Sequence, residues 1–108
     1  MARTARRYDI YLPLANNDGV PFPDVLFKSV EGRLLDRCGG VTSQEREYAL
    51  RGTWRDDSQL YLDQVIVITA LDFRRRGSTQ FISQLKKSLL EEFDQREILI
   101  TESALRVH

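Results

Sequence analysis

The feature that most constrains the fold is a long hairpin pattern over residues 47–71, with one helical segment before it and one after. Over residues 48–54, large apolar residues alternate with others at period two, as in a half-buried strand. The polar cluster Asp56-Asp57-Ser58-Gln59 separates this stretch from the β-branched run at 65–68. We therefore predict two antiparallel strands joined by a turn centred on Asp57-Ser58.

A turn at this position fixes which residues of the two strands face each other. The predicted pairs on one face are Leu50–Val65, Gly52–Asp63 and Trp54–Tyr61. Arg51 then lies on the opposite face, and a slip of one residue would exchange the two faces.

The remaining elements follow from periodicity and turn chemistry. Residues 8–14 alternate as a strand, and Asn16-Asn17-Asp18-Gly19 is a turn signal. A helix starts near Pro23, carries the apolar stripe Leu26, Phe27, Val30, Leu34 and Cys38, and ends at Gly39-Gly40. Within it, Gly32 suggests a close approach to the sheet. After a polar connection at 42–46 and the hairpin, Ser78 or Thr79 caps a second helix. The last strand spans about 96–101, and residues 105–108 extend it or lie across an edge.

The order strand, helix, strand, strand, helix, strand predicts one α+β domain over residues 1–108. We expect a ferredoxin-like βαββαβ sandwich, with both helices on one face of a four-stranded antiparallel sheet. The first and third strands are central in that arrangement, and residues 1–7 are expected to be flexible.

The third strand is apolar on both sides, since Val65 and Val67 alternate with Ile66 and Ile68. Helices can cover only one of these sides. A sheet that is apolar on both faces favours a second covering layer, so we expect a homodimer joined through sheet faces or edges. The alternative is that β-branched residues simply suit a strand whose open face is partly exposed.

Composition excludes several classes of function. Sixteen basic and sixteen acidic residues cancel, so no global field favours nucleic acid or an anionic membrane, and we expect neither as a partner. With Cys38 and His108 as the only residues of their kinds, a zinc site within one chain is nearly excluded, and we expect no metal and no cofactor. The basic residues 1–7 are not followed by an apolar stretch, so we expect a cytoplasmic protein.

The hairpin supplies the most site-like group of residues. Gly52 opposite Asp63 leaves a gap bounded by the rings of Trp54 and Tyr61. Asp63 lies in an otherwise apolar strand and can serve as a general base or hold a cationic group. In the structural alternative, Asp63 pairs with Arg51 or Arg55, or lies at the solvated end of the strand.

A second candidate is Arg74-Arg75-Arg76, just before the second helix. Because cations are unfavourable at a helix N-terminus, these arginines with Ser78 and Thr79 can hold a phosphate or carboxylate. A solvated loop is the alternative. No RNA-binding aromatic pattern occurs on the central strands.

Four short motifs together resemble small bacterial proteins of an uncharacterised family: Tyr11-Leu12-Pro13-Leu14, Asp18-Gly19, Gly39-Gly40-Val41-Thr42 and Gly52-Thr53-Trp54. The resemblance spans residues 8 to about 72. It implies a compact ferredoxin-like α+β domain and carries no activity or catalytic residue with it.

The sequence leaves three functional classes open. The leading hypothesis is a dimeric small-molecule-binding or regulatory module, with a small and possibly anionic ligand near the hairpin or the dimer seam. The second is a cofactor-independent enzyme of the dimeric α+β-barrel kind, with Asp63 as acid–base and Tyr61 and Trp54 lining the cavity. The third is a structural or interaction subunit.

Overall fold

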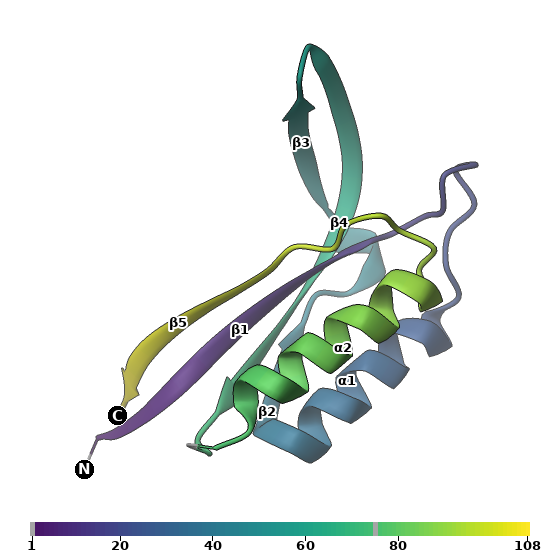
Figure 1. Cartoon of the computed structure of the whole chain (residues 1–108). Helices are drawn as coiled ribbons and strands as arrows, with labels where there is room; N and C mark the ends of the chain where they lie inside the picture. Colours follow the sequence, from purple (N-terminus) through teal and green to yellow (C-terminus); the bar gives the residue numbers. More distant parts are fainter. Residues whose placement is uncertain (1, 75) are drawn as a thin grey trace.

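The chain folds into a two-layer α+β structure in which two helices lie side by side against one face of an antiparallel sheet (Figure 1). The computed structural model describes residues 2–74 and 76–108. In chain order its elements are β1 (Arg3–Pro13), α1 (Asp24–Cys38), β2 (Gly39–Ser43), the 3-10 turn Arg46–Tyr48, β3 (Leu50–Asp56), β4 (Gln59–Asp72), α2 (Ser78–Glu92) and β5 (Ile100–Val107).

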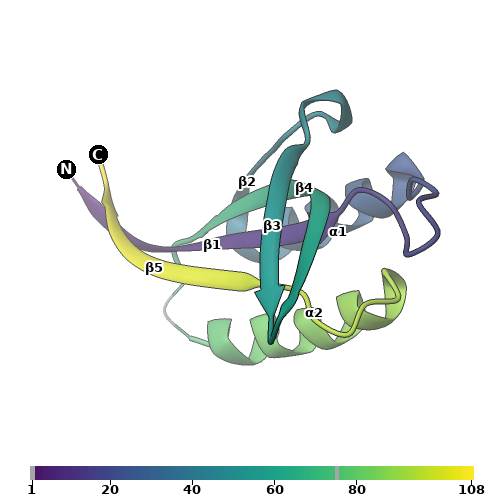
Figure 2. The same cartoon turned by 90° about the horizontal axis from the view of Figure 1, so that it is seen from above.

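The sheet has five strands among the described residues, and β4 organises it. Strands β2, β4, β1 and β5 are neighbours in that order, while β3 pairs with the other end of β4. With 14 residues, β4 is long enough to pair β3 along its first half and β2 along its second half. Its first half rises out of the sheet with β3 as a projecting hairpin (Figures 1 and 2).

The register of this hairpin is the predicted one. Leu50 pairs with Val65, Gly52 with Asp63 and Trp54 with Tyr61. The pair Asp56–Gln59 closes a two-residue turn, in which Asp57 adopts a positive φ of 53°. Asp tolerates this left-handed conformation better than most residues, which explains its place in the turn.

The core lies between the helices and the sheet. Tyr8, Ile10 and Leu12 of β1 are buried, and so are Ile66 and Ile68 of β4. Their helical partners are Phe27, Val30, Leu34 and Cys38 of α1 and Leu85 and Leu89 of α2. Full burial of one such side chain stabilises the fold by about 1.5–3 kcal/mol. The predicted apolar stripe of α1 therefore faces the sheet, and so do the buried leucines of α2.

The two helices begin and end differently from each other. Helix α1 follows Pro23 and ends at Gly39, which has a φ of 91° and whose amide donates to the Leu35 carbonyl. Helix α2 has Gly77 at its N-cap, with a φ of 80° and no side-chain cap. The predicted cap by Ser78 or Thr79 is therefore wrong. The Ser78 hydroxyl instead donates to the Asp72 carboxylate over 2.6 Å.

The strand count and several bounds also differ from the predictions. The sheet has five strands instead of four, because the segment after α1 contains the short strand β2. This glycine-containing strand is ordered by its pairing with the long β4. The predicted four-stranded ferredoxin-like sandwich therefore describes the sheet only in part. Strand β1 starts at Arg3, so most of the 1–7 segment pairs with β5. Strand β5 starts at Ile100 and includes residues 105–107, which extend it.

The predicted close approach of Gly32 to the sheet is wrong. Gly32 is exposed, and a Cβ added there would meet nothing within 4 Å. Nothing in the structure explains a glycine at this position.

Candidate functional site

The face of the sheet away from the helices, which we call the open face, carries polar side chains at its centre. Side chains alternate along a strand, so the residues between the buried ones point to this face. They are Arg7, Asp9 and Tyr11 of β1 and Val67 and Thr69 of β4. Asp9 is directly opposite Thr69 in the pairing of the two central strands.

A groove of about 290 Å³ runs over this part of the open face, a size near the lower end of small-molecule sites. Beside the five open-face residues, it is lined by Thr42, Ser43, Gln44 and Leu50. Strands β1, β2, β3 and β4 therefore all contribute to it. Val67 and Leu50 give it an apolar side, and the hydroxyl, amide and charged groups give it a polar one.

Asp9 is the central polar residue of the groove. Its Oδ1 accepts a 2.6 Å hydrogen bond from the Thr69 hydroxyl. The Nε of Arg7 lies 3.2 Å from each carboxylate oxygen. The Asp9 side chain is 18% exposed, so it is oriented by its neighbours and still open to the groove.

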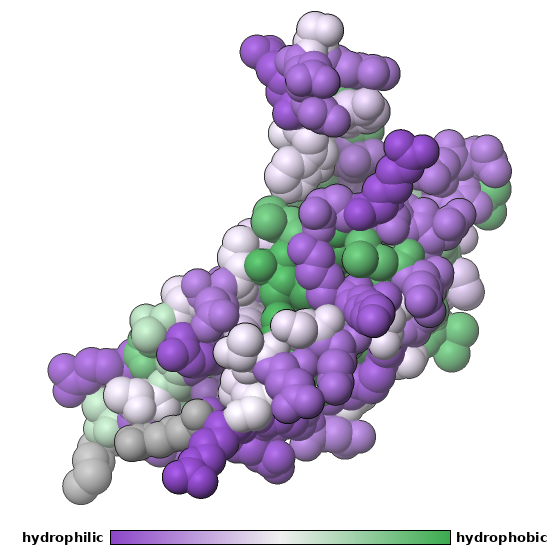
Figure 3. All heavy atoms as spheres, in the orientation of Figure 1, coloured by the Kyte–Doolittle hydropathy of each residue, from purple (hydrophilic) through white to green (hydrophobic). Residues whose placement is uncertain are grey.

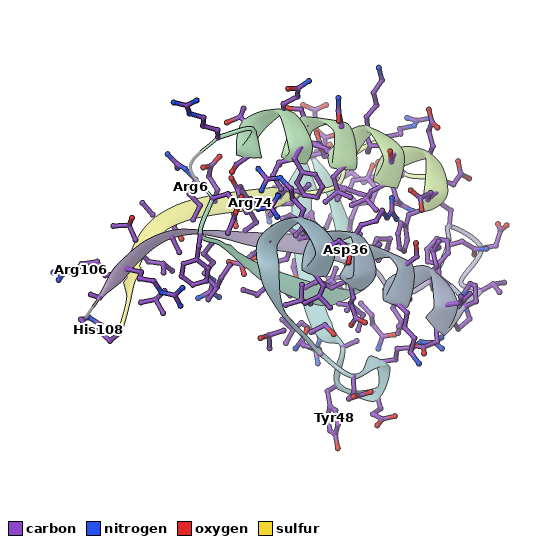
Figure 4. The ribbon with its side chains drawn as sticks, turned by 90° about the horizontal axis from the view of Figure 1, so that it is seen from below. Arg6, Asp36, Tyr48, Arg74, Arg106 and His108 are labelled. Carbon is purple, nitrogen blue, oxygen red and sulfur yellow. The ribbon has the colours of Figure 1, made fainter. Side chains whose placement is uncertain are left out.

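Gln44 completes the edge of the groove where β2 has ended and β3 has not yet begun. Its Oε1 accepts a 3.1 Å hydrogen bond from the Val67 amide of β4, replacing a strand partner there. Its Nε2 donates to the Tyr48 carbonyl over 3.4 Å. The side chain therefore holds the 44–49 loop at the groove, while the Tyr48 ring points into solvent (Figure 4).

The structure brings three of the four predicted hairpin residues to one face. Trp54, Tyr61 and Asp63 share their face with Leu50, which lines the groove, whereas Arg51 lies on the other face. The predicted gap over Gly52 is filled, because the Trp54 Nε1 would lie 3.0 Å from a Cβ at that position.

Asp63 itself is exposed, and among the described residues it forms no ion pair with Arg51 or Arg55. Its carboxylate therefore lacks the apolar burial on which its proposed acid–base role was based. The solvated-strand interpretation agrees better with this position.

The predicted anion site at 74–76 is organised around an internal carboxylate. Asp72, 1% exposed, accepts hydrogen bonds from the Arg74 amide and the Ser78 hydroxyl. The Nη1 atom of Arg37 lies 3.5 Å from Oδ1 of Asp72. The Nη2 atom of Arg37 donates to the Arg76 carbonyl over 2.8 Å. Asp72 thus provides a negative charge beside the first residue of α2. Arg75 lies outside the described residues.

Two groups beside this buried cluster have raised pKa values. Burial is the main cause of the raised pKa of the Tyr8 hydroxyl, and the charge of Glu102 adds to it. Burial also raises the pKa of the Cys38 thiol, with a further contribution from Asp72. A protonated, buried thiol is a poor nucleophile, which agrees with a packing role for Cys38.

Large apolar side chains gather on the projecting hairpin. Leu50, Trp54, Leu60, Tyr61 and Leu62 are all between 41% and 66% exposed. In the view of Figure 3 the tip of the hairpin is mainly polar, and hydrophobic atoms gather below its base. An exposed apolar arm of this kind is typical of an interaction surface.

The sequence interpretation missed Asp9, Thr69 and Gln44. A signal was present for the first two, since each is a polar residue at an outward position between buried apolar ones. Gln44 carried no such signal, because its role depends on the gap between β2 and β3.

The comparisons with known proteins show the fold. No protein-family model and no curated protein matches the chain. Among solved structures, a phage SAM lyase in complex with S-methyl-5′-thioadenosine aligns with a TM-score of 0.64 and 17% identity, over 95% of this chain and 88% of that one. A phage SAM lyase in its apo state aligns with a TM-score of 0.60 and 16% identity, over 98% and 89%. At these identities the likeness extends to the small α+β fold and no further.

Neither a metal-holding cluster nor a membrane-spanning helix occurs among the described residues. No group of three or more His, Cys, Asp or Glu residues among them is placed to hold a metal ion. Within the same residues, no helix is long and apolar enough to cross a membrane.

Proposed function

We propose that this protein binds a small molecule in the open-face groove and acts in the cytoplasm as a homodimer. The observation that carries the proposal is the convergence of Arg7, Asp9, Tyr11 and Thr69 beside the apolar Val67 in one groove. A small number of oriented polar groups next to apolar lining is typical of ligand sites.

The ligand class we propose is a nucleoside joined to sulfur. Support comes from the fold shared with a lyase solved with S-methyl-5′-thioadenosine. The groove offers acceptors for ribose hydroxyls at Asp9, and apolar contact for a base or thioether at Val67 and Leu50. A regulatory module would use the same site for binding alone.

A second candidate is an enzyme acting on the same ligand, favoured by the lyase named in both fold neighbours. This enzyme would work without a cofactor. In this candidate the acid–base is one of two carboxylates, Asp9 in the groove or Asp63 on the hairpin.

The experiment compares three identical changes, Asp9→Asn, Asp63→Asn and Asp36→Asn, by calorimetric titration with S-methyl-5′-thioadenosine. Asp36 is exposed on α1, away from the groove, and serves as the control (Figure 4). Loss of a hydrogen bond to a charged group costs about 1.5–3 kcal/mol, so Asp9→Asn should weaken binding about tenfold or more.

Binding weakened by Asp63→Asn alone would move the site to the hairpin. If S-methyl-5′-thioadenosine does not bind the unaltered protein, the proposed ligand class is wrong. Product analysis after incubation with S-adenosylmethionine separates the enzyme from the binding module.

A further inference from the structure

The two charged residues of the groove, Arg7 and Asp9, form an ion pair with each other. Arg7 and Asp9 are two residues apart on one strand, on the same face, with the guanidinium Nε 3.2 Å from both carboxylate oxygens. Their side chains are 48% and 18% exposed. Both line the groove, so the pair is accessible to a ligand.

Stability does not account for this pair. Exposed ion pairs contribute about 0–1 kcal/mol. Because Arg7 and Asp9 belong to the same strand, their contact joins no separate elements of the fold. Asp9 has its own link to β4 through the Thr69 hydroxyl, so Arg7 is not needed to orient it.

Both partners keep unused hydrogen-bonding capacity. Within the described part of the chain, the two terminal nitrogens of Arg7 donate to no protein group. They form the planar fork that recognises a carboxylate. On Asp9, Oδ2 accepts from Arg7 alone, so it can accept from an ammonium group.

Two further hydroxyls flank the pair from the neighbouring strand. In the pairing of β1 with β5, Ser103 is opposite Arg7 and Thr101 is opposite Asp9. Opposed residues of paired strands point to the same face, and both hydroxyl residues are exposed. The surroundings of the pair are therefore polar and accessible.

We propose that Arg7 and Asp9 form a subsite for the zwitterionic α-amino-acid group of the ligand, with Arg7 binding its carboxylate and Asp9, which also accepts from a ribose hydroxyl, binding its ammonium. This inference rests on the proposed function and deepens it. The ligand is then a nucleoside thioether or sulfonium that carries an amino acid, and the shorter methylthio nucleoside occupies only part of the groove.

The test uses two probes that differ in the amino-acid group: S-adenosylhomocysteine and S-methyl-5′-thioadenosine. The unaltered protein should bind S-adenosylhomocysteine about tenfold more tightly, because charge-assisted hydrogen bonds are added. Arg7→Gln should bring the two dissociation constants to within about twofold, because it should weaken binding of S-adenosylhomocysteine more than binding of S-methyl-5′-thioadenosine. Arg106→Gln, exposed near the end of β5, is the control (Figure 4).

The outcomes separate the two proposals. Equal binding of both probes by the unaltered protein overturns the zwitterion subsite and leaves the proposed function standing. If neither probe binds, the proposed function fails and the subsite fails with it. A preference that survives Arg7→Gln, in a variant with an unchanged circular dichroism spectrum and melting temperature, also overturns the subsite.

Discussion

The buried hydroxyl of Tyr8 makes the free energy of unfolding depend on pH in the alkaline range. The side chain is 1% exposed, and its hydroxyl makes no well-formed hydrogen bond among the described residues, because the nearby Ser78 hydroxyl donates to Asp72 instead. Burial, and then Glu102, raises its pKa above the ordinary 10.0. The folded state therefore holds this proton more tightly than the unfolded state, so the resulting stability is complete below about pH 10 and is lost as pH rises through the folded pKa.

The corresponding prediction concerns Tyr8→Phe. At pH 7 the variant should be as stable as the unaltered protein, or more stable by about 1 kcal/mol, since an unpaired buried hydroxyl is removed. Above pH 10 the advantage should grow. Urea unfolding at several pH values measures both, with Tyr48→Phe as the exposed control. A large loss of stability at pH 7 would show that the hydroxyl has a partner.

Asp72 differs from Tyr8, because both of its carboxylate oxygens accept hydrogen bonds from neighbouring groups. Asp72→Ala leaves the Arg37 charge and the Ser78 hydroxyl without their acceptor. We expect a loss of about 3–5 kcal/mol in the free energy of unfolding, the usual cost of removing one member of a buried pair. Asp72→Asn should cost less, because it keeps the shape and one oxygen acceptor. Equal losses in the two variants would contradict a role for the charge.

Among the elements, the hairpin of β3 and β4 depends on Gly52 for the position of the Trp54 ring on its face. A Cβ at Gly52 would lie 3.0 Å from the Trp54 indole nitrogen, so Gly52→Ala should displace the ring. Since Trp54 is the only tryptophan, its emission should shift to longer wavelength and its quenching by iodide should increase. Gly40→Ala, where a Cβ meets nothing within 4 Å, is the matched control. An unchanged spectrum in Gly52→Ala would show that the ring does not rest on Gly52.

Prediction from sequence succeeded for elements whose signals are local. Strand alternation and turn chemistry placed the hairpin in its correct register, and the left-handed Gly39 marked the end of α1. Prediction failed where a local structure depends on contacts with residues distant in the sequence. Strand β2 forms because β4 is long enough to pair with it. Ser78 does not cap α2, because its hydroxyl donates to the buried Asp72 instead. For the same reason the groove, built from four strands, was not predicted as a unit.

At the scale of the whole molecule, the projecting hairpin contributes little to the fold that carries it. The buried core cluster contains no residue from β3 and begins on β4 only at Ile66. Leu60 and Leu62 near the tip are more than half exposed. Apolar side chains on an arm that adds little to the core of its own chain are available to bury surface in another copy.

We therefore predict that Leu62→Arg weakens self-association about tenfold or more, with little change in melting temperature. Leu35→Arg is the matched control, because Leu35 is an equally apolar side chain, 52% exposed on α1. Sedimentation equilibrium over a range of protein concentrations measures the dissociation constant of both variants. A buried leucine contributes about 1.5–3 kcal/mol, and a charge placed in an apolar interface adds desolvation cost, so the effect is within reach of the method. If the unaltered protein is a monomer at every concentration, the homodimer is wrong, and the apolar arm must serve a different protein.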